Sequence, residues 1–257
     1  MIEQNQKAWD QKVKTGAAYT HPVSSEAIQK AKEGDWNIHI TVDRPVPKQW
    51  FPSSLYNVKI LCLASGGGQQ GPILAAAGAD VTVFDLSDNQ LAQDRYVAER
   101  DGLMLKTIQG EMSNLSSFTN ESFDIIVHPV SNVFVEDIQP VWQECARVLK
   151  KGGTLIAGFT HPFLYVFDDE EEERGRLKVR HSVPTNSIAH LSEVEKNRWL
   201  EQNNTVEYAH TLEDQLQGQI DAGFSIIGFY EDDFGGTRLI DQHIKSFAAT
   251  RAVKNGV

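Results

Sequence analysis

The segment that most restricts the fold of this chain runs from residue 58 to residue 85. A short, nearly continuous apolar run at 58–64 leads into a glycine-rich turn at 65–71, and a second apolar run at 81–85 follows an alanine-rich stretch. Short apolar runs of this kind are typical of strands buried on both faces of a parallel sheet. The pattern predicts strand, glycine turn, helix and strand, with Pro72 at the first helical position and Gly78 ending the helix.

The same alternation continues to residue 158. Ser87 and Gln90 match a capping box that opens a helix ending near Gly102. Further strands are predicted from their apolar pattern at 105–109, 123–127 and 154–158. The helix before the last of them ends at Gly152-Gly153 and buries a stripe formed by Ile138, Trp142, Cys145 and Leu149. Strands that recur with helical spacers predict an α/β fold with a doubly wound, Rossmann-like sheet.

The chain divides into four segments on this interpretation. Residues 1–56 mix tryptophans with polar sequence and form an N-terminal helical and loop segment, and residues 57–159 form a cofactor-binding core. Residues 160–212 depart from the strand and helix rhythm and are interpreted as an inserted lid over the substrate. Residues 213–257 return to the core, with a helix near 212–222 and closing strands at 224–230 and 246–253.

The charge balance restricts the partners. Lys and Arg number 24 against 35 Asp and Glu, a formal net charge of −11, which is the wrong sign for tracking nucleic acid phosphates. No apolar run approaches the roughly 20 residues that span a bilayer, and the first residues are too polar for a secretory signal. Cys62 and Cys145 fit buried reduced thiols. We therefore expect a cytoplasmic protein without membrane insertion, whose oligomeric state the sequence leaves open.

The glycine turn carries the first chemical signal. Gly66, Gly68 and Gly71 satisfy G-x-G-x-x-G between a strand and a helix, and Asp85 ends the next strand, nineteen residues beyond Gly66. Glycines let a ligand approach the backbone, and the carboxylate accepts hydrogen bonds from a ribose. This combination predicts a site for a nucleoside-containing cofactor.

Three functions fit such a site. Nicotinamide-dependent oxidoreductases and S-adenosylmethionine-dependent methyltransferases both place adenosine over this half of the sheet. The Tyr-x-x-x-Lys pair of short-chain dehydrogenases is absent, because none of the six tyrosines is followed four residues later by lysine. An NAD(P)-dependent oxidoreductase therefore stays as the alternative enzyme, and a non-catalytic regulatory module that binds the cofactor is the third interpretation.

Several ordered motifs resemble the class I S-adenosylmethionine-dependent methyltransferases, in particular the type 11 or ubiquinone and menaquinone biosynthesis group. Residues 60–68, Ile-Leu-Cys-Leu-Ala-Ser-Gly-Gly-Gly, align with the family's first motif, with Cys62 in place of an acid and Ala64 in place of the first glycine. Glu111 stands for the Asp of the segment after the third strand, and residues 147–153, Arg-Val-Leu-Lys-Lys-Gly-Gly, match the Arg-Val-Leu-Lys-Pro-Gly-Gly signature with Lys151 for Pro.

The resemblance implies a seven-stranded sheet, mostly parallel, whose last strand inserts antiparallel beside the fifth. It also implies S-adenosylmethionine as cofactor, S-adenosylhomocysteine as product and a small-molecule methyl acceptor. The residues that would bind the cofactor are Ala64, Ser65, Gly66, Gly67, Gly68, Gln69, Asp85, Leu86, Gln90, Gly110, Glu111, Met112, His128 and Pro129.

Two histidines follow strands at the carboxyl edge of the expected sheet. His128 and His161 are the candidates for a general base, since imidazole titrates near neutrality. The side chains expected to close over the acceptor are Trp36, Trp50, Phe51, Asn132, Tyr165 and Phe167. The acidic run from Asp168 to Glu173 is expected to be a mobile, solvated loop. No metal site is predicted, because the histidines and cysteines lack ligand spacing.

Overall fold

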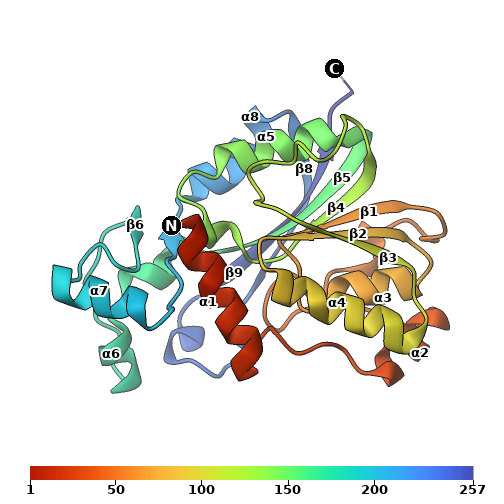
Figure 1. Cartoon of the computed structure of the whole chain (residues 1–257). Helices are drawn as coiled ribbons and strands as arrows, with labels where there is room; N and C mark the ends of the chain where they lie inside the picture. Colours follow the sequence, from red (N-terminus) through yellow and green to blue (C-terminus); the bar gives the residue numbers. More distant parts are fainter. Residues whose placement is uncertain (257) are drawn as a thin grey trace.

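The fold is built on one seven-stranded sheet with the order β3-β2-β1-β4-β5-β9-β8. The computed structural model describes residues 1–256 (Figure 1). The strands are β1 (Lys59–Leu63), β2 (Asp80–Asp85), β3 (Leu105–Gln109), β4 (Phe123–His128), β5 (Leu149–Thr160), β8 (Phe224–Asp232) and β9 (Phe247–Lys254). The pairs among β1 to β5 are parallel, and β9 runs antiparallel between β5 and β8. The predicted α/β fold and the antiparallel strand beside the fifth are confirmed.

Helices cover both faces of this sheet, in two layers (Figure 1). One layer holds α3 (Gln70–Ala76) and α4 (Asp88–Asp101), and the other holds α5 (Gln139–Val148), the π-helical turn η4 (Glu213–Gln217) and α8 (Gly218–Asp221). Alternate residues of β1 serve the two layers, because successive side chains of a strand point to opposite faces. Ile60 and Cys62 pack with Leu74 of α3, whereas Leu61 and Leu63 pack in the cluster that contains Trp142 of α5. β1 is therefore buried on both faces, as its apolar run predicts.

Local signals set most element ends. The Ser87 hydroxyl accepts the Gln90 N–H at 3.1 Å, and α4 ends at Gly102 in the left-handed conformation with φ of 64°. The reciprocal bond of a full capping box is not formed, and the Gln90 Oε1 atom has no partner among residues 1–256. Pro72 is the third residue of α3 and not the first, because the helix already begins at Gln70. The predicted positions of these helices hold, while the first-turn details differ.

The start of β5 differs from the sequence prediction. α5 ends at Val148, so Leu149, the last residue of the predicted buried stripe, already belongs to the strand. β5 pairs with β4 at Leu149 and again from Thr154 on, and the register shifts between Phe123 and Ile125 of β4. Gly152 lies in the part of β5 between these pairs and has a left-handed φ of 74°. The glycine pair was expected to stop a helix. It bends the first part of a long strand instead.

Two segments lie largely outside the sheet (Figure 1). The N-terminal part contains α1 (Ile2–Thr15), α2 (Ser25–Lys32) and η1 (Lys48–Trp50). The region predicted as a lid holds η3 (Pro162–Val166), α6 (Asp169–Glu173), α7 (Glu193–Glu201) and a small antiparallel pair formed by β6 (Thr185–Asn186) and β7 (Tyr208–Ala209). A third excursion between β8 and β9 contains η5 (Leu239–Gln242), and η2 (Asn132–Phe134) follows β4. None of the helices in residues 1–256 is long and apolar enough to cross a membrane.

The acidic run is helical, which corrects the expectation of a loop, while Asp169, Glu170 and Glu173 are exposed to solvent as expected. Residues 169–173 form α6, and the Asp168 side chain caps it by accepting the Glu171 N–H at 3.2 Å. Only 6% of Asp168 and 9% of Glu172 is exposed. Asp168 pairs with Arg180, and Glu172 pairs with Arg238 from the third excursion. Basic partners supplied from outside the run therefore allow two of its carboxylates to be buried.

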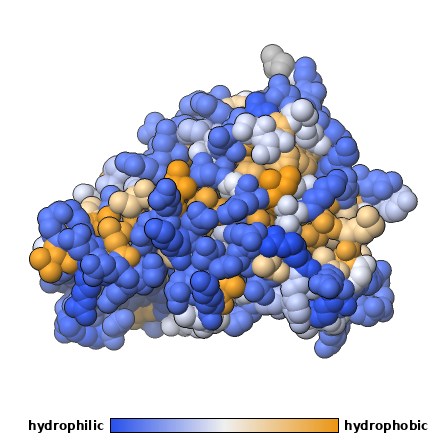
Figure 2. All heavy atoms as spheres, viewed as in Figure 1, coloured by the Kyte–Doolittle hydropathy of each residue, from blue (hydrophilic) through white to orange (hydrophobic). Residues whose placement is uncertain are grey.

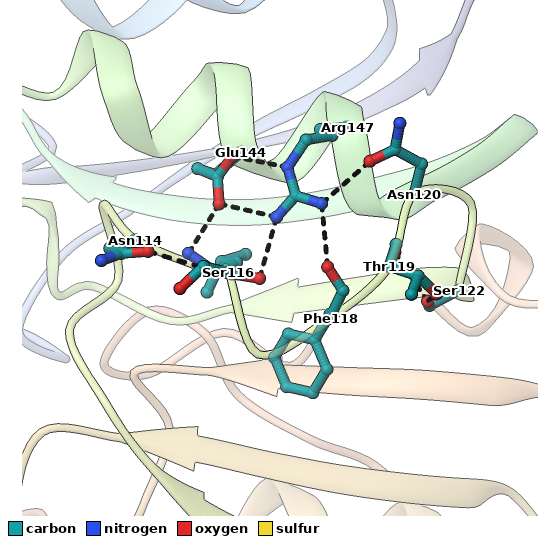
Figure 3. A network of polar contacts seen from close by, with 9 residues as sticks. Asn114, Ser116, Phe118, Thr119, Asn120, Ser122, Glu144 and Arg147 are labelled. Carbon is teal, nitrogen blue, oxygen red and sulfur yellow. Dashed lines mark hydrogen bonds and ion pairs between the residues drawn. The ribbon is translucent and has the colours of Figure 1, made fainter.

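Arg147 ties the chain after β3 to α5 (Figure 3). Its Nε donates to the Glu144 carboxylate at 2.6 Å and Nη2 donates to the other oxygen of that carboxylate at 2.8 Å. The same guanidinium donates to the carbonyl oxygens of Leu115 at 2.8 Å and Phe118 at 2.9 Å. Glu144 also accepts the Leu115 N–H at 2.6 Å. The arginine of the 147–153 signature thus has a structural role.

We expect Arg147→Ala to lower the free energy of unfolding by about 2 kcal/mol, since the variant loses a two-bonded ion pair and the guanidinium hydrogen bonds to the Leu115 and Phe118 carbonyl oxygens. Arg95→Ala is the matched control, because its pair with Asp88 is largely exposed and contributes little. Urea denaturation of both variants measures the difference. Equal stability of the two would show that the Arg147 network does not hold this loop.

Candidate functional site

A cavity of about 560 Å³ opens at the carboxyl ends of the parallel strands. Its walls come from the glycine turn after β1, the end of β2, the segment after β3 and the loop after β4. α1, η3 and the excursion between β8 and β9 supply the opposite side. Parallel sheets place ligand sites in this position, and the volume is that of a pocket for one or two small molecules.

The glycine turn brings backbone to the cavity where a side chain would not fit. A Cβ at Gly66 would lie 2.7 Å from the Gln90 Cβ and 3.1 Å from the Asp85 carboxyl group. Gly68 has a φ of 72°, and a Cβ there would lie 2.8 Å from the Pro22 side chain. Both positions require glycine for the turn to lie against α4 and the N-terminal segment.

Asp85 presents its carboxyl group at the edge of the cavity. Oδ2 accepts the Gly66 N–H at 2.8 Å and Oδ1 accepts the Ser87 N–H at 2.9 Å. Burial raises the pKa of Asp85, and the backbone hydrogen bonds from Ser87 and Gly66 oppose that rise. A carboxyl group held in this way still has acceptor capacity for a ligand hydroxyl.

Asp94 supports the glycine turn from beneath and was missed from the sequence. Its Oδ2 accepts the Gly67 N–H at 3.0 Å, and the residue is fully buried on α4. Burial raises the pKa of Asp94 to about 8. Nothing in a polar helix pattern marks this position, because its carboxyl group points inward only once α4 packs on the turn.

The segment after β3 forms the far wall of this end of the cavity. A Cβ at Gly110 would lie 2.1 Å from the Phe84 ring, so the chain passes flat across that ring. Glu111 accepts the Ser113 N–H at 3.0 Å, and Met112 packs into the core beside Phe84. Gln90 adds a buried acceptor, its Oε1 atom, that no group in residues 1–256 satisfies.

The structure brings most of the predicted cofactor residues to one cavity. Those that line it are Ala64, Ser65, Gly66, Gln69, Asp85, Leu86, Gln90, Gly110, Glu111, Met112 and Pro129. Gly67, Gly68 and His128 are not among the lining residues.

His128 lies on the face of β4 that packs against α5. Its ring is fully buried and meets the Trp142 ring edge-on, with centroids 6.2 Å apart. Nδ1 is 2.9 Å from the Leu63 carbonyl oxygen, and Nε2 contacts the Asn132 side chain, which bonds the Gln215 side chain at 2.9 Å. Burial lowers the pKa of His128. Through these contacts the ring connects the end of β4 to the end of β1 and, through Asn132, to η4.

His161 also does not line the cavity. Its Nδ1 accepts the Phe163 N–H at 3.3 Å and caps η3. Partial burial lowers the pKa of His161. His128 and His161 were both expected to face the crevice, but neither lines the cavity. The histidine that lines it is His39.

The predicted acceptor side chains are divided between the cavity and the core. Tyr165 lines the cavity, and its hydroxyl donates to the Glu207 carboxylate at 2.9 Å. Trp50 and Phe51 belong to the core on the α3 face, and Trp36 packs edge-on against Phe51. Asn132 is buried against His128, and Phe167 pairs with Val179 in an isolated bridge.

One face of α1 supplies cavity residues that sequence reasoning missed. Ile2, Asn5, Trp9 and Lys12 recur at intervals of three and four residues, so they share a stripe of the helix and all line the cavity. On the face seen in Figure 2, hydrophilic residues predominate over α1, as its other side chains are mostly polar. The spacing was visible in the sequence, whereas the surface that it would meet was not.

Three carboxylates gather outside this cavity. Asp43, Asp232 and Asp233 place oxygens within 4.8 Å of one another. Asp232 accepts the N–H groups of Asp43 and Arg44, each at 2.9 Å, and Asp233 pairs with Lys245. The absence of a metal site stays a prediction.

The raised pKa of Asp94 predicts a pH dependence of stability. The pKa of Asp94 is about 8 in the folded protein and 3.8 in its ordinary state, so between these pH values the folded state binds one more proton than the unfolded state. The free energy of unfolding therefore falls as the pH rises from about 4 toward 8. We expect the unfolding free energy of the wild type to fall more steeply between about pH 5 and 8 than that of Asp94→Asn.

Denaturation series at several pH values test this expectation. Glu99→Gln is the matched control on the exposed side of α4 and keeps the wild-type slope. Parallel curves for the wild type and Asp94→Asn would contradict a titrating carboxyl group beneath the turn.

Comparisons with a family model and with known proteins agree on one family. Residues 61–157 match the family model described as a methyltransferase domain. The chain is 53% identical over 254 residues to the uncharacterized methyltransferase YbaJ of Bacillus subtilis, covering 99% of this chain and 98% of that protein. It is 32% identical over 108 residues to a ubiquinone biosynthesis O-methyltransferase of Actinobacillus pleuropneumoniae, which covers 40% of this chain and 46% of that one.

Solved structures share the fold at low sequence identity. A crystal structure of an S-adenosylmethionine-dependent methyltransferase from Mesorhizobium loti aligns with a TM-score of 0.62 at 19% identity, covering 80% of this chain and 95% of that one. The [4+2]-cyclase SpnF aligns with a TM-score of 0.56 at 15% identity, covering 81% and 79%. The fold therefore hosts more than one reaction, and the assignment rests on the relatives and on the site.

Proposed function

Since this chain belongs to the methyltransferase family, we propose that it transfers a methyl group from S-adenosylmethionine to a small-molecule acceptor. The observation that carries the proposal is one continuous cavity. It is lined both by the glycine turn and Asp85 and by α1, Tyr165 and Glu207.

The residues at the sheet end fit the proposed cofactor in size and in hydrogen bonding. Asp85 would accept hydrogen bonds from the ribose, and Ser65, Gly66 and Gln69 would surround the methionyl part. The segment 110–112 would border adenine, where Gly110 leaves room for a flat ring beside Phe84. The unpartnered Gln90 Oε1 atom offers a further acceptor to a ligand donor at this end.

The reaction needs orientation more than proton transfer from the protein. When bound, S-adenosylmethionine supplies a methyl group that its sulfonium already activates. The chain holds the acceptor in line, and its aromatic walls exclude water from the reacting atoms. His128 and His161 do not line the cavity, so we propose a bracing role for His128 rather than base catalysis.

The alternatives receive less support. The relatives are methyltransferases, which disfavours the NAD(P)-dependent oxidoreductase. A regulatory module that had lost its acceptor site would have the lid region filled by its own side chains, whereas the cavity continues to Leu164 and Glu207. Two buried free thiols favour a reducing compartment, so we propose that the enzyme acts in the cytoplasm.

We expect Asp85→Ala to weaken binding of S-adenosylhomocysteine about tenfold, because the ribose loses charge-assisted hydrogen bonds. Isothermal titration calorimetry measures the change. Asp80→Ala, at the exposed start of the same strand, is the control and binds as the wild type does. Unchanged affinity in Asp85→Ala would place the ribose elsewhere.

The activity itself is tested with methyl-labelled S-adenosylmethionine and a metabolite extract from cells. We expect label to appear in a small molecule with the wild type and much less with Asp85→Ala. Tight binding of NAD(P)H without any response to S-adenosylhomocysteine would refute the proposal.

A further inference from the structure

The part of the cavity that α1, η3 and the loop after β4 line, here called the acceptor end, has mainly apolar walls. We define it by the residues Trp9, Lys12, Phe134, Tyr165, Glu207 and Phe234. Trp9 and Phe134 meet edge-on with ring centroids 5.3 Å apart. Aromatic walls of this kind accept a flat or apolar molecular body, and the few polar groups between them fix its orientation.

Most polar side chains near this end are already bonded to the protein. Glu207 accepts hydrogen bonds from the Tyr165 hydroxyl at 2.9 Å and the Thr205 hydroxyl at 3.3 Å. Arg238 pairs with Glu172 and lies over the Phe234 ring. These contacts hold the walls of the acceptor end together, and Glu207, like Asp85, keeps acceptor capacity for a ligand donor.

Asn5 behaves in the same way. Its Nδ2 donates to the carbonyl oxygens of Phe134 at 3.1 Å and Val206 at 3.0 Å, and its Oδ1 accepts the Val206 N–H at 2.7 Å. This amide joins α1 to the loop after β4 and to residue 206.

Lys12 is the exception. No hydrogen bond or carboxylate within 4.0 Å engages its Nζ among residues 1–256, and the ammonium lies 4.3 Å from the centroid of the Trp9 ring. Burial lowers the pKa of Lys12, and the charge of Glu207 opposes that change. The Nζ atom is not among the buried atoms without a partner, so it keeps contact with the cavity and its donors are free for a ligand.

We propose that Lys12 binds an anionic oxygen of the methyl acceptor, a carboxylate or phenolate, while the apolar body of the acceptor packs against Trp9 and Phe134. The inference rests on the proposed function, because it assigns a substrate class to the same cavity. Lys12 is a specificity-determining residue on this assignment.

The carboxylate of the cofactor is the other anion that Lys12 could meet. α1 also passes close to the proposed ribose site, because Asp10 accepts the Ser87 hydroxyl at 2.6 Å. The acceptor is favoured because the ring under Lys12 is Trp9, which packs on Phe134 from the loop after β4. The glycine turn is approached instead by the Tyr19 carbonyl oxygen and by Pro22. The test therefore measures both anions separately.

Three probes of similar shape and different charge test the inference: phenylacetate, phenylacetamide and phenethylamine. Each is titrated by calorimetry into the full-length protein saturated with S-adenosylhomocysteine. We expect phenylacetate to bind at least about tenfold more tightly than the neutral amide, and phenethylamine to bind most weakly.

Variants of α1 assign the preference to one residue. Lys12→Met removes the preference for phenylacetate and leaves the affinity for S-adenosylhomocysteine unchanged, which also shows that the variant is folded. Lys12→Arg retains the preference. Lys14→Met, on the exposed side of the same helix, binds all probes as the wild type does.

Other results overturn the inference. Equal affinity for the acid and the amide, no binding of the acid at millimolar concentration, or an unchanged preference in Lys12→Met would each do so. Loss of S-adenosylhomocysteine binding in Lys12→Met would assign the lysine to the cofactor. A wild type that does not bind S-adenosylhomocysteine would overturn the proposed function together with this inference, whereas normal binding without acid preference overturns the inference alone.

Discussion

The hydrogen bond from the Gly66 N–H to the Asp85 carboxyl group joins the first turn of the sheet to the end of the neighbouring strand, at 2.8 Å. This approach is open only to a residue without a side chain, because Gln90 and Asp85 fill the space where a Cβ would lie. Asp94 fixes the same turn from below through Gly67. The cofactor end of the cavity is therefore shaped by backbone and buried carboxyl groups, and it is formed before any ligand arrives.

The sequence predicts those features whose cause lies in neighbouring residues, such as the bounds of strands and the ends of helices. The strand at 105–109 agrees with β3 in both bounds, and the cap at Ser87 and the end at Gly102 follow from side-chain chemistry and left-handed backbone. Asp85 reaches the cavity because the end of a parallel strand must lie at the sheet's carboxyl edge. The order of the strands came from the family resemblance and not from the pattern of residues.

Side-chain direction at a strand end is less predictable. His128 follows Ile126 on the α5 face, where both are buried, and so it packs against Trp142 although its backbone lies at the carboxyl edge. Trp50 and Phe51 show the same limit, because an aromatic residue fills a core as readily as it closes a pocket. The acceptor end joins α1, Tyr165 and Glu207, which are far apart in the chain. Only the packed fold shows that they meet.

The order of the last two strands has a consequence for biosynthesis. β8 forms its ladder with β9 alone, whereas β9 also pairs with β5, so the strand made earlier joins the sheet only through the strand made later. Until β9 has left the ribosome, the edge of β5 that β9 covers has unpaired backbone groups. Along this edge of β5 the new chain can pair with strands of other chains until β9 joins the sheet.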